Sequence, residues 1–210
     1  FFLVIKFPPP KQSKGVPFRE TVKLAGNGSL LLIAFFLFFQ SGFEGIINNW
    51  TTTYITTRLG TEQSTALFAL TFFVAGLVAM RLLTGSLFRG FSSLRLLIIT
   101  FSLTIAGLII LKLGNSYNFS VAGLILLGAG LAGGFPIMLG IAGGLFAELS
   151  GTAFSIIFFI ALIGNTIINF LMGLVAQHFG VTHLLTFAFA ETLIMIILSA
   201  VILNKTRHIK

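Results

Sequence analysis

The sequence predicts an all-α fold, a polytopic membrane helix bundle with six transmembrane helices. Of the 210 residues, 56% are hydrophobic and only 9% are charged, whereas soluble domains carry roughly 25% charged residues. The apolar residues are gathered in long segments, and a helix that spans a bilayer needs about 20 mostly apolar residues. Helices are expected in particular because a helix satisfies its own backbone hydrogen bonds in lipid.

The six apolar segments follow one another with short interruptions. They are residues 29–54, 65–88, 96–113, 119–147, 152–177 and 184–203. Gly, Asn and Ser, which are typical of turns, occupy the interruptions, and short loops predict antiparallel neighbours. We therefore expect a helical domain at residues 29–204. It would follow the end of an earlier helix and a basic linker (residues 1–28) and precede a basic tail (residues 205–210), all within a longer protein.

The basic residues predict the orientation. Cytoplasmic loops are enriched in Lys and Arg, and all but Arg58 and Lys112 of the 13 basic residues fall on one side of the predicted bundle. That side holds Lys6, Lys11, Lys14, Arg19, Lys23, Arg81, Arg89, Arg95, Lys205, Arg207 and Lys210. We expect a multi-pass integral protein of a plasma membrane or bacterial inner membrane, with both ends of the chain cytoplasmic. This pattern also explains the net charge of +8, so no nucleic-acid partner is expected.

The composition also limits the chemistry. The chain has no Cys, which excludes disulfides, Cys-ligated zinc and thiol catalysis. His178 and His183 lack partners at metal-ligand spacing, so neither a metal nor a cofactor is expected. No catalytic nucleophile–base set is present, and we therefore do not expect an enzyme.

Glu44 lies deep inside the first apolar segment. At about 1.5 Å per residue it is about 21 Å along the helix from Leu30. A carboxylate at this depth is costly and usually faces a bundle interior or a water-filled path. Gln40 and Asn48 lie one helical turn to either side, so the three polar groups share one face. This pattern predicts a stripe that handles substrate or protons; hydrogen bonding between helices is the structural alternative.

Four further residues are candidates for the same site. Asn49 falls opposite Gln40 on a straight helix. Trp50 could stack on a sugar ring or anchor the helix at the outer membrane interface. Asn165 and Asn169 are one turn apart in the fifth segment, where lining a cavity and joining helices are both open.

Other residues suggest gating or structural roles. Arg81, Gly85 and Arg89 lie near the cytoplasmic end of the second segment, and Pro136 lies within the fourth. Pro136 can kink its helix and free carbonyl groups. Glu191 lies eight residues into the last segment, where a protonated or snorkelling carboxyl group and a role in ion coupling are both open.

Four segments resemble parts of a known transporter superfamily, three of them helices and one a loop. Residues 38–54 (FFQSGFEGIINNWTTTY) are similar to the seventh helix of the fucose/galactose/glucose:proton symporter family. Residues 80–89 (MRLLTGSLFR) resemble a Gly/Asp/Arg loop signature, with Phe88 in place of its acid. Residues 128–136 and 151–180 resemble the tenth and eleventh helices. On these motifs the chain resembles the C-terminal six-helix half of a major facilitator superfamily transporter.

The resemblance implies a function. Such transporters look like two six-helix halves, each a 3+3 inverted repeat, so the missing N-terminal half is an expected partner. It implies secondary active transport of a small polar, sugar-like solute by proton or sodium symport with alternating access. The main proton-coupling acids of the family lie in the N-terminal half, so Glu44 is either a solute ligand or a proton carrier.

Two other functions compete with sugar symport. The first is a superfamily exporter of amphipathic compounds, whose cavity should be more aromatic and contain fewer amides than residues 40–49. The second is a non-transporting membrane subunit or receptor, against which the absence of a sizeable soluble domain in this chain argues.

Overall fold

The computed structural model describes residues 18–86, 88 and 90–207. Its elements are α1 (Phe18–Ala25), α2 (Gly28–Leu59), α3 (Gln63–Ser86), α4 (Ser93–Leu113), α5 (Tyr117–Leu131), α6 (Gly134–Leu145), a 3₁₀ turn (Ala147–Leu149), α7 (Ser150–Phe179), a second 3₁₀ turn (Val181–His183) and α8 (Leu184–Arg207). Six helical segments, α5 and α6 counting as one, are long and apolar enough to cross a membrane. The predicted all-α bundle with six spans is thereby confirmed.

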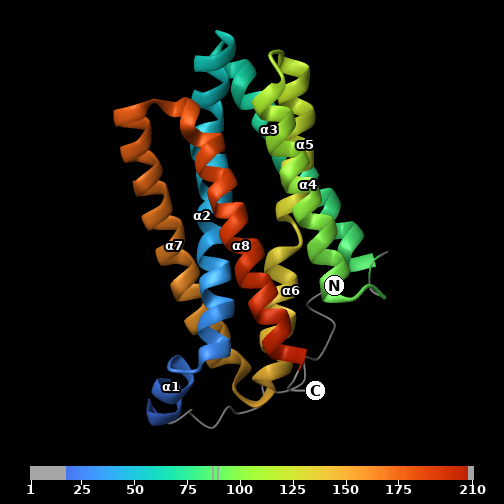
Figure 1. Cartoon of the computed structure of the whole chain (residues 1–210), viewed down its shortest axis with the longest axis vertical. Helices are drawn as coiled ribbons and strands as arrows, with labels where there is room; N and C mark the ends of the chain where they lie inside the picture. Colours follow the sequence, from blue (N-terminus) through green and yellow to red (C-terminus); the bar gives the residue numbers. More distant parts are fainter. Residues whose placement is uncertain (1–17, 87, 89, 208–210) are drawn as a thin grey trace, which may run out of the picture.

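The spans are arranged as two side-by-side groups. One contains α2, α7 and α8, and the other contains α3, α4 and α5 (Figure 1). The most extensive contacts join α2 to α7, α3 to α5 and α4 to α5, while α8 packs against both α2 and α4. The short helix α1 and the end of α8 lie at the same end of the bundle (Figure 1).

Capping residues explain why α2 extends beyond the predicted residues 29–54. The side-chain oxygen of Asn27 accepts hydrogen bonds from the backbone N–H groups of Ser29 (2.9 Å) and Leu30 (3.2 Å), as an N-cap residue does. At the other end, Gly60 adopts a left-handed conformation with φ 65°, which stops the helix. Hydropathy marks where a helix meets lipid, whereas caps mark where the helix ends.

The fourth predicted span, residues 119–147, is broken into α5 and α6. The break falls at residues 132 and 133, ahead of the predicted kink at Pro136. Pro136 is instead the third residue of α6, where a backbone N–H has no helical partner and its absence costs little. The break leaves the carbonyl group of Leu131 available to a side chain from another helix.

Glycines allow the closest contact between α2 and α7. A Cβ atom at Gly164 would overlap the carbonyl oxygen of Phe38, and one at Gly42 would lie 2.7 Å from Cβ of Ile168. Real Cβ atoms essentially never come within 3.0 Å of such neighbours. Small residues at these positions let the two helix backbones approach, as in other membrane bundles.

Candidate functional site

Glu44 lies close to the middle of α2 and joins two other polar side chains. Its Oε1 accepts a hydrogen bond from Gln40 Nε2 at 3.3 Å and lies 3.6 Å from a guanidinium nitrogen of Arg81 on α3. The side chains of Glu44 and Arg81 are 21% and 45% exposed, respectively. We call Gln40, Glu44 and Arg81 the carboxylate cluster. Its two charges lie on the flank of the bundle rather than in the bundle core.

Gln40 connects this cluster to the break between α5 and α6. The residue is only 1% exposed, and its Nε2 donates to the carbonyl oxygen of Leu131 at 2.5 Å. Because Nε2 has acceptors in both Leu131 and Glu44, the orientation of the amide is fixed. Its Oε1 faces Gly134, where a Cβ atom would overlap it. Gln40 therefore links the charged flank with the interior of the bundle.

A second polar group lies between α2 and α7. Asn49 Nδ2 donates to Oδ1 of Asn169 at 2.9 Å, and Asn169 Nδ2 donates to the carbonyl oxygen of Asn165 at 2.8 Å. Asn165 Nδ2 in turn donates to the carbonyl oxygen of Ser41 at 2.8 Å. We call Asn49, Asn165 and Asn169 the amide cluster. The structure thus brings together three of the predicted site residues from two distant parts of the sequence.

Glycines also give the amide cluster its space. A Cβ atom at Gly45 would lie 2.7 Å from Nδ2 of Asn165 and would overlap Asn169. Further along the same interface, the half-buried ring of Trp50 lies over Gly173, with Cζ2 at 3.6 Å from the position of a Cβ atom there. The α2–α7 interface is therefore shaped around amide and aromatic side chains.

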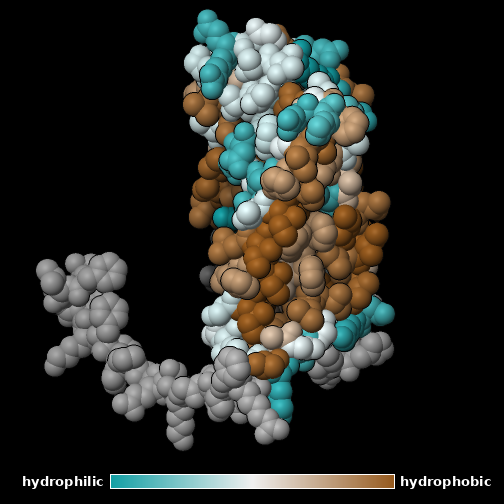
Figure 2. All heavy atoms as spheres, turned by 90° about the vertical axis from the view of Figure 1, so that its left-hand side faces the viewer, coloured by the Kyte–Doolittle hydropathy of each residue, from teal (hydrophilic) through white to brown (hydrophobic). Residues whose placement is uncertain are grey.

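The predicted stripe of Gln40, Glu44 and Asn48 changes from buried to exposed along α2. Gln40 is buried, Glu44 is half-buried and Asn48 is exposed. Asn48 Nδ2 donates to the carbonyl oxygen of Glu44 in its own helix at 2.7 Å, so its oxygen remains open to a ligand. Figure 2 shows the α7 side of the bundle, where hydrophilic and intermediate residues extend from the upper end towards a broad hydrophobic band.

Two other predicted gating residues, Gly85 and Pro136, lie apart from both clusters. Gly85 is exposed near the end of α3, and Arg89 lies outside the described residues. Pro136 is exposed on α6 and lines a groove of about 850 Å³ between the α3–α4 connection, α6 and α8. Among the described gating candidates, Arg81 is thus the one that belongs to the carboxylate cluster.

Sequence reasoning missed several contacts. It placed Arg81 in a structural or gating role without pairing it with Glu44, and it did not identify the carbonyl groups of Ser41 and Leu131 as acceptors. It also missed Arg58, whose guanidinium donates to the carbonyl oxygens of Leu111 and Lys112 at 2.6 Å each. A cation near the last turn of a helix is favourable, but the spacing between α2 and α4 in the sequence carries no signal for this contact.

The fold is that of a multi-pass, all-α membrane protein, because six of its helical segments are long and apolar enough to span a bilayer. No protein-family model matches the chain, and no curated protein matches it significantly. Within the described residues, no group of three or more His, Cys, Asp or Glu side chains could hold a metal ion. The carboxylate cluster and the amide cluster together form the candidate functional site.

Proposed function

We propose that this protein is a secondary active transporter of a small polar, sugar-like solute, driven by cation symport with alternating access. The observation that carries the proposal is the pair of polar clusters beside α2, both within helical segments that are long and apolar enough to span a membrane. Amides offer both donors and acceptors, a carboxylate offers acceptors and a guanidinium offers donors. Together they suit a solute with many hydroxyl groups.

The exposure of the charged pair supports a binding role. Ionisable side chains inside a membrane almost always face a bundle interior or a water-filled cavity rather than lipid. Glu44 and Arg81 are 21% and 45% exposed in this six-helix unit, so their flank should be covered by protein or water. A second six-helix half, the N-terminal half of the same transporter, would cover it and complete a cavity at this depth.

The packing pattern supports a 3+3 inverted repeat. In such a repeat the first three spans (α2, α3 and α4) correspond in order to the last three (α5–α6, α7 and α8). The α2–α7 contact of one repeat then corresponds to the α5–α3 contact of the other. The same correspondence relates α2–α8 to α5–α4 and α2–α3 to α6–α7, and all six of these pairs pack together. Inverted repeats of this kind place the substrate site near the midplane of the membrane, and Glu44 is close to the middle residue of α2. This pattern agrees with the proposed membership of the major facilitator superfamily.

Uptake by the full-length protein tests the proposed function. We expect proteoliposomes with the full-length protein to accumulate at least one member of a panel of radiolabelled sugars when a proton or sodium gradient is imposed. Accumulation should stop when the gradient is dissipated. If no sugar of the panel is bound or taken up under either gradient, sugar symport is wrong.

The proposed orientation has both ends of this chain in the cytoplasm. It predicts that single cysteines placed at Lys11 and Lys205 react with a membrane-impermeant maleimide only after cells are permeabilised, whereas a cysteine at Asn115, in the α4–α5 loop, reacts in intact cells. The 210 residues contain no native Cys, so they add no background labelling of their own. Labelling of Lys205→Cys in intact cells would show that the orientation is the opposite of the one proposed.

A further inference from the structure

Glu191 is a second membrane-embedded acid, and it lies apart from both clusters. It belongs to the buried face of α8, and the helices against which α8 packs most extensively are α2 and α4. Glu191 is only 3% exposed. Neither of its carboxyl oxygens has a hydrogen-bond partner among the residues that the structure describes. This isolation differs from the surroundings of Glu44, which has both a hydrogen bond and an ion pair.

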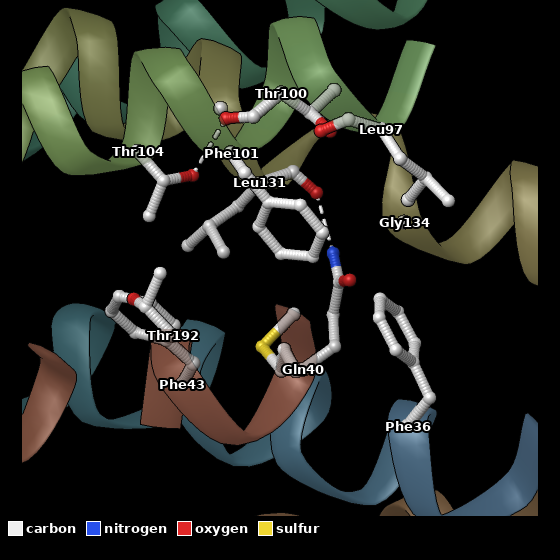
Figure 3. A pocket seen from close by; sticks show the side chains of 12 residues that line it. Phe36, Gln40, Phe43, Leu97, Thr100, Phe101, Thr104, Leu131, Gly134 and Thr192 are labelled. Carbon is white, nitrogen blue, oxygen red and sulfur yellow. Dashed lines mark hydrogen bonds between the residues drawn. The ribbon is translucent and has the colours of Figure 1, made fainter. Parts of the chain in front are cut away.

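The polar side chains around the cavity that Thr192 lines do not donate to Glu191. Its neighbour Thr192 lines a cavity of about 10 Å³ with Gln40, Thr100 and Thr104, which is about the space that a single water molecule needs. Figure 3 shows these side chains converging from α2, α4 and α8. The three threonine hydroxyls donate to carbonyl groups of their own helices. The cavity is too small to bring bulk water to the interior.

Charged and titratable groups on the elements that pack against α8 do not neutralise Glu191. They are Glu44, Tyr54 and Arg58 on α2, Arg95 and Lys112 on α4, His178 on α7, and His183 in the second 3₁₀ turn. Arg58 donates to Tyr54 and to α4 carbonyl groups, while the ammonium group of Lys112 lies over the ring of Phe189. Among the described residues, the one ion pair is Arg81–Glu44.

We propose that Glu191 is a proton-binding site inside the six-helix unit and that its proton takes part in the symport. An ionised carboxylate without a partner is costly in a low-dielectric interior, so this packing accommodates the neutral acid. One proton from the aqueous phase binds one carboxylate oxygen and removes the charge. Release of that proton requires water or a cation to reach the carboxylate, and therefore requires α8 to separate from α2 and α4. Proton binding is thereby linked to a change in helix packing.

Proton binding is measurable without any transport. In the full-length protein, an infrared difference spectrum between wild type and Glu191→Gln at pH 7 should contain the C=O band of a protonated carboxyl group. Gln is the matched variant because it keeps the shape and neutrality of the acid, so we expect a normal yield and melting temperature. Glu148→Gln alters an exposed acid and should remove no such band. Absence of a protonated-carboxyl band in the Glu191 difference spectrum would overturn the proposal.

The role of this proton in symport rests on the proposed function and needs a separate readout. Glu191→Gln should reduce gradient-driven accumulation at least tenfold while solute exchange across proteoliposomes continues. Unchanged accumulation would overturn the coupling role. If the wild type itself carries no sugar, the proposed function fails, and the infrared band still decides whether Glu191 binds a proton.

Discussion

The α2–α7 and α3–α5 interfaces are built on the same principle but carry different side chains. In each, glycines bring one helix against the backbone of the other: Gly164 lies against Phe38 in the first, and Gly128 lies against Phe73 in the second. The α2–α7 interface holds the amide cluster. Between α3 and α5, the described residues form a single side-chain hydrogen bond, from Tyr117 to Thr65 near one end of the pair.

This difference bears on the purpose of the amide cluster. The α3–α5 interface shows that two helices of this bundle pack closely through glycine and apolar side chains alone over most of their length. Amides at α2–α7 are therefore not needed for close packing, and hydrogen bonds between membrane helices contribute only about 0.6 kcal/mol each on average. The comparison supports solute binding as the reason for amides on α2 and α7.

The largest loss of stability is expected at the glycine contacts, which both interfaces have. Gly164→Val and Gly128→Val each place a side chain where backbone atoms of the neighbouring helix lie. Overpacking typically costs about 1–3 kcal/mol and sometimes more. Because the backbone relaxes less easily than a side chain, we expect each substitution to lower the free energy of unfolding by at least about 3 kcal/mol. Gly151→Val is the control, because a Cβ atom there meets nothing within 4 Å. Size-exclusion profiles and melting temperatures measure the loss, and a tolerated Gly128→Val would show that the interfaces differ in packing too.

A smaller effect should separate binding from stability at α2–α7. Asn165→Ala removes the side chain that bonds to Ser41 and Asn169. We expect solute affinity to fall about tenfold, or about 1.4 kcal/mol, while the melting temperature changes little. A large drop in melting temperature with unchanged affinity would instead identify the amide cluster as a contact that only joins helices.

The smallest effect is expected at α3–α5. Tyr117→Phe removes its hydroxyl group and the 3.3 Å hydrogen bond to Thr65, which should cost about 0.5–1.5 kcal/mol of stability. Solute affinity should stay the same because this interface lies outside both clusters. A weaker affinity in Tyr117→Phe would mean that the two interfaces are not functionally distinct.

The sequence predicted the spans well because lipid imposes a simple rule on hydropathy and length. It was less successful with α2, whose ends depend on Asn27 and Gly60, and with the fourth span, which breaks before Pro136. Hydropathy does not record caps or local breaks, so these features required the structure.

The candidate site was predictable only in part. Polar residues at helical spacing pointed to Gln40, Glu44 and Asn48, but which neighbours they would meet depends on how helices pack. The pairing of Glu44 with Arg81 joins residues on different helices, and the isolation of Glu191 depends on α2 and α4. A single sequence contains no pattern that specifies such contacts.

The most direct test of solute binding by the carboxylate cluster is the equilibrium affinity of the full-length protein for its transported sugar. Titration calorimetry compares this affinity between wild type and Glu44→Ala. Loss of a partner from a buried polar contact costs roughly 1–3 kcal/mol, so we expect the affinity to fall about 10- to 100-fold, at about 1.4 kcal/mol per tenfold. Glu44→Gln should retain much of the affinity if the residue is a hydrogen-bonding ligand, and Glu148→Ala should retain all of it. An unchanged affinity in correctly folded Glu44→Ala would remove Glu44 from the solute site and contradict the account.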